Sequence, residues 1–168
     1  PCVLGDERRE RELRVGEPAG RTVEVEVLRS PAGEATETST LPFDTLELDN
    51  RLKDVQLALL GRSATTRRIV PEYERAVQEF GDLLFDTVFT GEVRSLLDRS
   101  RAEAMNQGVG LRVKLRFESA DMASLPWEFL HDTRRDEYLA LSRTTPIVRH
   151  VELAEPQRPL IVTRPLRV

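Results

Sequence analysis

Glu128 and His131 are the pair whose types and spacing could bind a metal ion. They stand three positions apart, so a helix would place both on one face. This spacing supplies ligands to the carboxylate-bridged metal centres of helical bundles, which need a second such pair and further carboxylates on facing long helices. The chain offers one pair in a short helix, so we expect no metal ion here. We expect Glu128 to bond nearby backbone amides or an arginine, and His131 to be half exposed at a strand turn.

Cys2 is the only cysteine and the only thiol that could act as a nucleophile. Catalysis would require ordered surrounding structure that holds the Cys2 thiol against His131 or His150. Cys2 lies in residues 1–10, which we expect to form a flexible terminus. The sequence also lacks the Gly-x-Ser-x-Gly, phosphate-cradling and dinucleotide-binding glycine motifs. We therefore predict no catalytic residue and no cofactor-binding residue within the chain, and no cofactor.

Arg112, Lys114 and Arg116 recur at every second position and could follow a phosphate backbone from one face of a strand. No aromatic residue is interleaved on that face to stack on bases. The competing interpretation is pairing with an acidic strand face such as Glu24 and Glu26, which would contribute about 0.2–1 kcal/mol per pair. The net charge of the chain is -4, which also argues against nucleic-acid binding. We expect the basic face to be solvated or paired.

The segment Ser124–Asp132 contains the only tryptophan, and we expect the rest of the fold to converge on it. Pro126 suits the first turn of a short helix. Trp127 and Leu130 are three residues apart and share the face that a buried helix must present, which Leu125 widens. We expect these four residues to have a structural role, with Trp127 in the core. The alternative is that Trp127 anchors an interface with another protein.

Alternating apolar residues predict the strands that surround this segment. Leu111, Val113, Leu115 and Phe117 alternate with charged side chains, which is typical of a strand with one buried face. The other predicted strands are Leu13–Val15, Val23–Val27 in a hairpin with Ala35–Thr40, Tyr138–Leu141 and Pro146–Val151.

Three helices are predicted upstream of the Leu111 strand. Asp44 and Glu47 form a capping-box pattern that begins the first helix, and Gly61 ends it. The second begins at Pro71 and carries an apolar stripe along one face. The third is capped by Thr90 and ends before Gly108.

Together these elements predict an α/β or α+β fold, in which a mixed sheet of about five or six strands is covered by two or three helices. A chain of 168 residues is long enough for one domain. We expect a flexible N-terminus over 1–10, a single domain over 11–151, and a linker with the start of a downstream core strand over 152–168. No apolar run is long enough to span a bilayer, and we expect a cytoplasmic protein without an internal disulfide.

Several spaced blocks of the chain resemble the front part of the CHAT domain, a bacterial relative of caspases and separase. They are Leu125-Pro126-Trp127-Glu128, then Leu130, Asp132, Tyr138–Leu141 and Thr145–Arg149, with Phe80-Gly81 and Phe89-x-Gly91-x-Val93 upstream. The resemblance implies the front half of a caspase-like fold. CHAT peptidases use a His followed by a Cys, each at the end of a core strand, and both are expected downstream of this region. The first core strand of such a peptidase half is expected to begin near Pro165–Val168.

The resemblance implies a non-catalytic front half that scaffolds a caspase-like cysteine peptidase, with the downstream half as its partner. The alternative is a non-enzymatic interaction module of a bacterial signalling or defence protein, which recognises a partner protein at its sheet edge or at a patch around Trp127. The two hypotheses differ in whether a His and a Cys follow residue 168. Either allows oligomers, and neither involves nucleic acid or a membrane.

Overall fold

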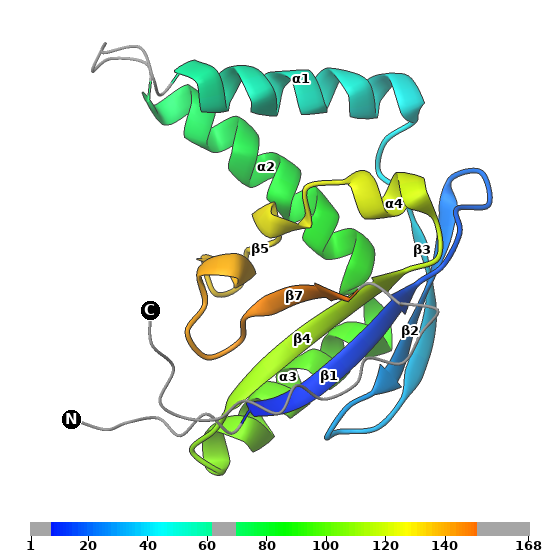
Figure 1. Cartoon of the computed structure of the whole chain (residues 1–168), viewed down its shortest axis with the longest axis vertical. Helices are drawn as coiled ribbons and strands as arrows, with labels where there is room; N and C mark the ends of the chain where they lie inside the picture. The colour runs from blue at the N-terminus through cyan, green and yellow to red at the C-terminus, as the bar shows by residue number, and fades with distance from the viewer. Residues whose placement is uncertain (1–7, 62–69, 151–168) are drawn as a thin grey trace, which may run out of the picture.

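The computed structural model describes residues 8–61 and 70–150, which form an α+β fold around a five-stranded mixed sheet (Figure 1). The strand order is β3-β2-β1-β4-β7. β1, β2 and β3 pair antiparallel, whereas β1 with β4 and β4 with β7 pair parallel. The strands are β1 Arg8–Val15, β2 Thr22–Arg29, β3 Ala35–Thr40, β4 Gly110–Phe117 and β7 Ile147–His150. This architecture confirms the predicted mixed sheet with packed helices.

The helices of the described residues are α1 Thr45–Gly61, α2 Val70–Val88, α3 Gly91–Asn106 and the short α4 Ala120–Ser124. After α4 come the 3-10 turn η1 Trp127–Phe129, the two-residue strands β5 His131–Asp132 and β6 Glu137–Tyr138, and the 3-10 turn η2 Leu139–Leu141. β5 and β6 pair antiparallel as a separate small hairpin. No described helix combines the length and apolar character needed to cross a membrane.

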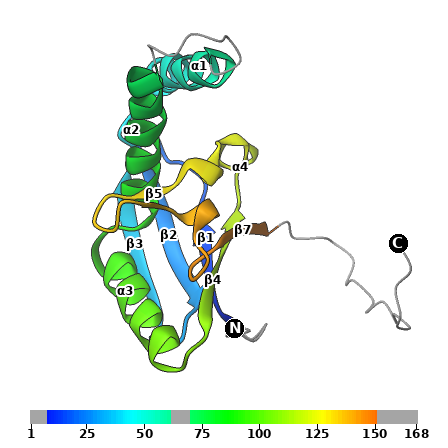
Figure 2. The same cartoon turned by 90° about the vertical axis from the view of Figure 1, so that its left-hand side faces the viewer.

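One face of the sheet is apolar and the other is charged, because the strands alternate as the sequence predicts. Leu13 and Val15 of β1 are fully buried together with Val113 and Leu115 of β4. α3 lies behind the sheet in Figure 1 and to one side of it in Figure 2. The side chains between the apolar ones carry charge, and those of β1 and β4 form ion pairs across the strands on the opposite face.

Two predicted element boundaries are wrong. β1 begins at Arg8, whereas residues 1–10 were predicted to be flexible and the strand was predicted over Leu13–Val15. Parallel pairing with β4 extends the strand through the charged residues before Leu13. The predicted strand Tyr138–Leu141 stops at Tyr138 and turns into η2. There the Leu139 amide donates to the Leu130 carbonyl oxygen at 3.0 Å, which fixes the buried Leu139 on the core. Cys2 and residues 152–168 lie outside the described residues.

The helix starts differ from each other in how they are capped. The Asp44 carboxylate accepts a hydrogen bond from the Glu47 amide at 2.8 Å, so the predicted cap of α1 is confirmed. Thr90 makes no side-chain cap for α3, contrary to prediction. Glu37 of β3 takes its place, accepting a hydrogen bond from the Glu92 amide at 2.9 Å. A side chain from the neighbouring strand therefore fixes the start of α3.

α1 stands away from the sheet with the first turns of α2 (Figure 1). Val55 is buried where α1 meets the rest of the molecule. Three leucines of α1 are exposed on the other side: Leu46 at 70%, Leu57 at 60% and Leu60 at 69%. The arm formed by α1 and α2 therefore presents apolar surface that no described residue covers.

Candidate functional site

Two buried polar clusters meet at β5, which contributes the adjacent residues His131 and Asp132. Both side chains are buried, at 2% and 0% exposure. Successive residues of a strand point to opposite sides, so the two side chains reach different helices. His131 contacts Asp82 of α2, and Asp132 contacts two arginines of α3. Neither cluster was predicted from the sequence.

Asp132 binds two guanidinium groups that lie two turns apart on α3. Its Oδ1 accepts from Arg94 Nη2 and its Oδ2 from Arg101 Nη1, both at 2.6 Å. Oδ1 also accepts from the Arg134 amide at 3.2 Å. Burial opposes ionisation of Asp132, but the hydrogen bonds from Arg101 and Arg94 outweigh it, so its pKa lies below the ordinary value. Asp132 is therefore a carboxylate at neutral pH that ties the β5 hairpin to α3.

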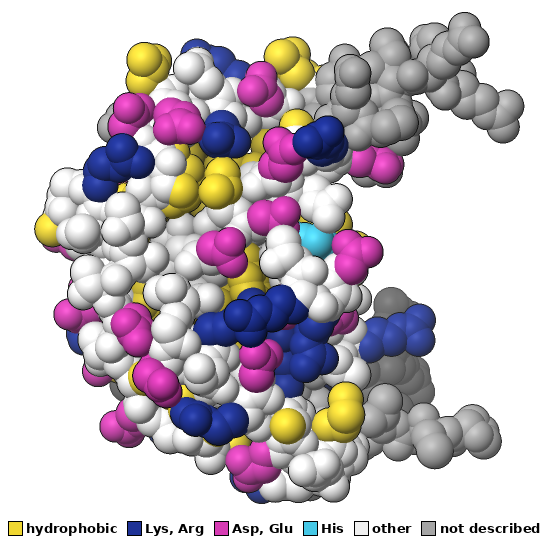
Figure 3. Space-filling view, turned by 180° about the vertical axis from the view of Figure 1, so that it is seen from behind, with side chains coloured by type: hydrophobic (Ala, Val, Ile, Leu, Met, Phe, Trp, Pro, Cys, Tyr) yellow, Lys and Arg dark blue, Asp and Glu magenta, His cyan; other side chains and the backbone are white. Residues whose placement is uncertain are grey.

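Arg11 of β1 adds a third buried guanidinium on the same side of the sheet. Its side chain is fully buried, and its Nη2 donates to the Val93 carbonyl oxygen at 2.8 Å. Burial and the nearby charge of Arg101 lower the pKa of Arg11 to about 10. Among the described residues no carboxylate lies within ion-pair distance of Arg11. Figure 3, seen from the side of α3, shows Lys and Arg side chains gathered in the middle of this face with Asp and Glu among them.

His131 lies between two carboxylates and against an aromatic ring. Its Nδ1 is 2.6 Å from Asp82 Oδ1, and its Nε2 is 3.3 Å from Asp136 Oδ1. The imidazole centroid is 4.7 Å from the Tyr138 ring, and burial together with Asp82 raises the pKa of Tyr138. The expectation of a half-exposed His131 is wrong. The reason is Gly81, which lets α2 approach so closely that an added Cβ would lie 3.2 Å from His131 Cβ and would collide with the Phe129 carbonyl oxygen.

Glu128 and His131 contact different partners in this structure. Glu128 forms an ion pair with Arg149 of β7 at 2.5 Å, as the arginine-bonding interpretation predicts. Burial alone would raise the pKa of Glu128, but the hydrogen bond from Arg149 lowers it below the ordinary value. Over residues 8–61 and 70–150, no group of three or more His, Cys, Asp or Glu side chains is arranged to hold a metal ion.

The basic face of β4 is paired, as predicted, but with a different strand. Lys114 Nζ lies 2.8 Å from Glu10 and Arg116 Nη1 lies 3.0 Å from Glu12, while Arg112 is 3.5 Å from Glu10. These acids belong to β1, the parallel neighbour of β4. The hydrogen bond from Lys114 lowers the pKa of Glu10.

Glu24 and Glu26, the acids predicted to pair with this basic face, lie one strand further along the sheet. Both belong to β2, which is separated from β4 by β1. Glu26 pairs with Arg14 of β1. The predicted partner strand was therefore wrong because the sequence does not reveal which strand lies beside β4.

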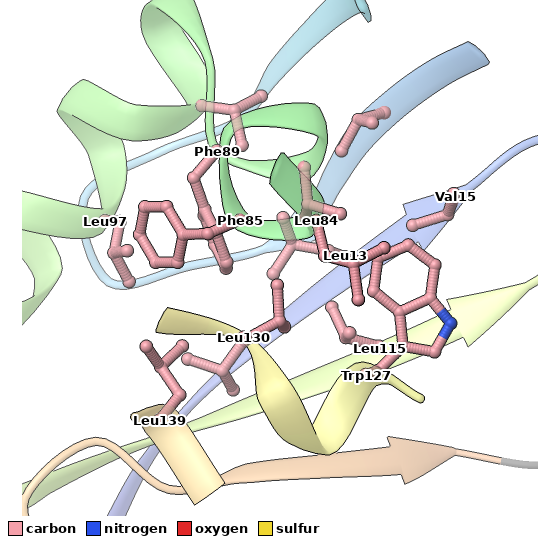
Figure 4. Packing of buried hydrophobic residues seen from close by; sticks show 14 of the residues in the cluster. Leu13, Val15, Leu84, Phe85, Phe89, Leu97, Leu115, Trp127, Leu130 and Leu139 are labelled. Atoms are coloured by element: carbon pink, nitrogen blue, oxygen red, sulfur yellow. The ribbon is translucent and has the colours of Figure 1, made fainter. Parts of the chain in front are cut away.

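Trp127 lies in the hydrophobic core, as predicted (Figure 4). Trp127 is 1% exposed, its Nε1 donates to the Met122 carbonyl oxygen at 2.6 Å, and its ring stacks on Phe117 at 5.0 Å between centroids. Leu125 and Leu130 are also buried. Pro126 precedes the 3-10 turn as its N-cap and does not lie inside a helical turn. Because Trp127 is buried, a docking patch centred on its ring is excluded.

β7 is an edge strand of the described sheet. It pairs with β4 on one side, and no described strand pairs with its other side. Val148, Arg149 and His150 are exposed along it. In the ladder with β4, the Val113 amide donates to the Pro146 carbonyl oxygen at 2.9 Å. Alternate residues of a parallel strand bond to opposite neighbours, so the N–H groups of Ile147 and Arg149 point to the open edge.

The arginine cluster was not predicted, although the sequence holds weak signals for it. Arg11 is two residues before Leu13 and four before Val15, so its strand position is on the buried face. Arg94 and Arg101 are seven residues apart, which is two turns of one helix face. Asp132 belongs to the blocks that carry the family resemblance, but its charge partners were not predicted.

Comparison with known proteins found no matching family model, curated protein or solved structure.

Proposed function

We propose that this chain is the non-catalytic front half of a caspase-like cysteine peptidase of the CHAT type, acting in the cytoplasm. In this proposal the chain scaffolds a peptidase half that supplies the catalytic His and Cys. The observation that carries it is the edge of β7 that no described strand pairs with. β1, β4 and β7 form a parallel run, and a further strand could extend that run by bonding to the outward N–H and C=O groups of β7.

The polar clusters at β5 support a scaffolding role, because their groups are engaged with each other. Asp132 is bound by Arg94 and Arg101, and His131 lies against Asp82. A buried carboxylate held by two guanidiniums is a poor general base, since its pKa lies below the ordinary value. We assign these residues to fixing the β5–β6 hairpin and η1 beside the sheet.

Co-expression tests the proposal directly. The 168-residue chain alone should self-associate through the unpaired edge of β7, and it should become monomeric and more stable when produced together with a peptidase half that supplies the neighbouring strand. Peptidase activity against a panel of fluorogenic peptides should arise only in that pair. Sedimentation measures the first part and fluorescence the second. Peptide hydrolysis by the chain alone with Cys2 mutated would contradict the assignment of catalysis to another segment.

A matched pair of variants at Arg149 tests the strand edge itself. Arg149→Pro removes the outward N–H of β7, whereas Arg149→Ala loses the ion pair with Glu128 but keeps that N–H. Arg149→Pro should weaken association with the downstream segment, and Arg149→Ala should preserve it. Equal binding by both variants would mean that β7 is not the site of strand addition.

The second candidate is a non-enzymatic protein-interaction module, and the exposed leucines of α1 favour it. Leu46, Leu57 and Leu60 present apolar surface on the arm that stands away from the sheet. This function would leave the chain a stable monomer that shows no peptidase activity with any downstream segment. That combination of results would replace the split-peptidase proposal.

A further inference from the structure

The three buried arginines carry more positive charge than the described carboxylates around them balance. Arg11, Arg94 and Arg101 are 0%, 8% and 5% exposed. The carboxylates in ion pairs with them are Asp132 and Asp98, and Asp98 is reached only at 3.5 Å by Arg94 and 3.9 Å by Arg101. Three cations therefore face two anions in a region from which water is largely excluded. A buried guanidinium without a counter-charge is costly, so the cluster has an affinity for one further anion.

The same arginines also retain donors without acceptors. Among the described residues, Arg11 Nε and Nη1 and Arg101 Nε and Nη2 are buried and have no hydrogen-bond partner. In Arg101 these two nitrogens form one complete edge of the guanidinium fork, which fits the oxygens of a phosphate or carboxylate in bidentate fashion. The opposite edge of Arg101 is occupied by Asp132 through Nη1. Burial, and after it the repulsion between the Arg11 and Arg101 charges, lowers the pKa of Arg11.

The number of unpartnered guanidinium nitrogens and their burial indicate the class of ligand. One oxyanion can accept both free donors of the Arg101 edge together with one donor of Arg11, and these three donors exceed what the two oxygens of a carboxylate accept with good geometry, whereas a tetrahedral oxyanion has oxygens for all three. The buried position favours a small free anion over a group on a large molecule. Arg134, whose side chain is 71% exposed and lies 3.7 Å from Asp98, stands at the rim of the cluster.

We propose that Arg11 and Arg101, with Arg94 beside them, form a binding site for one inorganic phosphate-sized oxyanion. The anion would lie between α3 and β1 and would complete the charge balance of the cluster. It would thereby strengthen the attachment of α3 to the sheet and to the β5 hairpin. This inference is independent of the peptidase proposal, because it uses only the described residues of the chain itself.

Equilibrium dialysis of the 168-residue chain against radiolabelled inorganic phosphate tests the site, and it works whatever the oligomeric state. The expected result is saturable binding of one phosphate per chain, displaced by sulfate and not by chloride at equal ionic strength. In thermal unfolding at constant ionic strength, each tenfold increase in phosphate above the Kd should raise Tm by about 3–5 °C. Absence of saturable binding by the wild-type chain would overturn the proposal.

The variant Arg11→Met removes a free guanidinium while keeping a long apolar side chain. It should weaken phosphate binding about tenfold or more, since charge-assisted hydrogen bonds are lost, and its Tm without phosphate should be equal to or above that of the wild type. Arg112→Met on the charged face of the sheet is the matched control and should bind phosphate normally. If Arg11→Met does not fold, Arg101→Lys, which keeps the charge but loses the fork, should show the weaker binding. Unchanged binding in the folded variant, or equal loss in Arg112→Met, would contradict the site.

Discussion

At the scale of single residues, Trp127 combines the largest buried ring with a satisfied polar group. Trp127→Ala should destabilise the domain by roughly 3–5 kcal/mol, because it removes the stacking on Phe117 and leaves a cavity between η1 and β4. Urea denaturation measures the loss. Leu141→Ala is the control, since Leu141 is 79% exposed and its truncation should change stability by less than about 0.5 kcal/mol. A loss in Trp127→Ala as small as in the control would contradict the core assignment.

Asp132 should control the acid stability of the domain. Asp132→Asn leaves Arg94 and Arg101 without their buried counter-ion and should cost roughly 3–5 kcal/mol. The folded pKa of Asp132 is below its ordinary value of 3.8, so its contribution is present above that value and is lost as pH falls through the folded pKa. Urea unfolding at about pH 7 and about pH 3 measures the free energy of unfolding of wild type and variant. The difference between the two free energies should be smaller at the lower pH. The control Asp121→Asn, at an exposed position, should have the same free energy of unfolding as the wild type at both pH values.

The buried charges mark the limit of what residue types alone predict. His131 was expected to be half exposed and is 2% exposed, and Arg11, which directly follows the stretch 1–10 that was expected to be flexible, is fully buried. Charged side chains are exposed by default, and only their partners make burial possible. For Arg11 and Asp132 those partners come from α3, far away in the sequence, so local patterns could not indicate them.

At the scale of elements, the contact between α2 and η1 depends on one glycine. Gly81→Ala should gain up to about 1 kcal/mol of helix propensity, yet the variant should be less stable by roughly 1–3 kcal/mol because the new methyl group meets the Phe129 backbone. Asp86→Ala at an exposed position of the same helix provides the control. Burial and Asp82 raise the pKa of Asp86, so its charge is not stabilising and its removal should be close to neutral. Thermal unfolding measures the stability of both variants. A Gly81→Ala variant that is more stable than the wild type would contradict the close approach of α2 to η1.

Most elements could be predicted because their signals are local. The β2–β3 hairpin, the cap of α1 and the alternation of β4 each depend on residues within a few positions of one another. The pairing of β1 with β4 could not be predicted, since both β1 and β2 offer acidic residues at alternate positions. Periodicity places a side chain on a face but does not order the strands in a sheet.

At the scale of the whole molecule, α1 should be much less stable towards local unfolding than the sheet. α1 packs mainly on α2 and carries exposed leucines, whereas β4 is enclosed by two strands and by α3. Local opening requires least free energy where few buried contacts are lost. Hydrogen exchange should therefore be faster by orders of magnitude in α1 than in β4. Equal protection in α1 and β4 would indicate that another segment or a partner covers the arm.

The parallel pairing of β1 with β4 also sets an order of events during synthesis. Glu10 and Lys114, which meet across this pair, are 104 residues apart in sequence. A ribosome adds about 5–20 residues per second, so β1 leaves the ribosome several seconds before its central neighbour exists. During that interval the β1–β2–β3 meander can form from local contacts, while the far side of β1 is a temporary edge with unpaired backbone groups. The glutamates of β1 that later pair with β4 then serve a second purpose, because a strand edge rich in charge resists pairing with the nascent chains of neighbouring ribosomes.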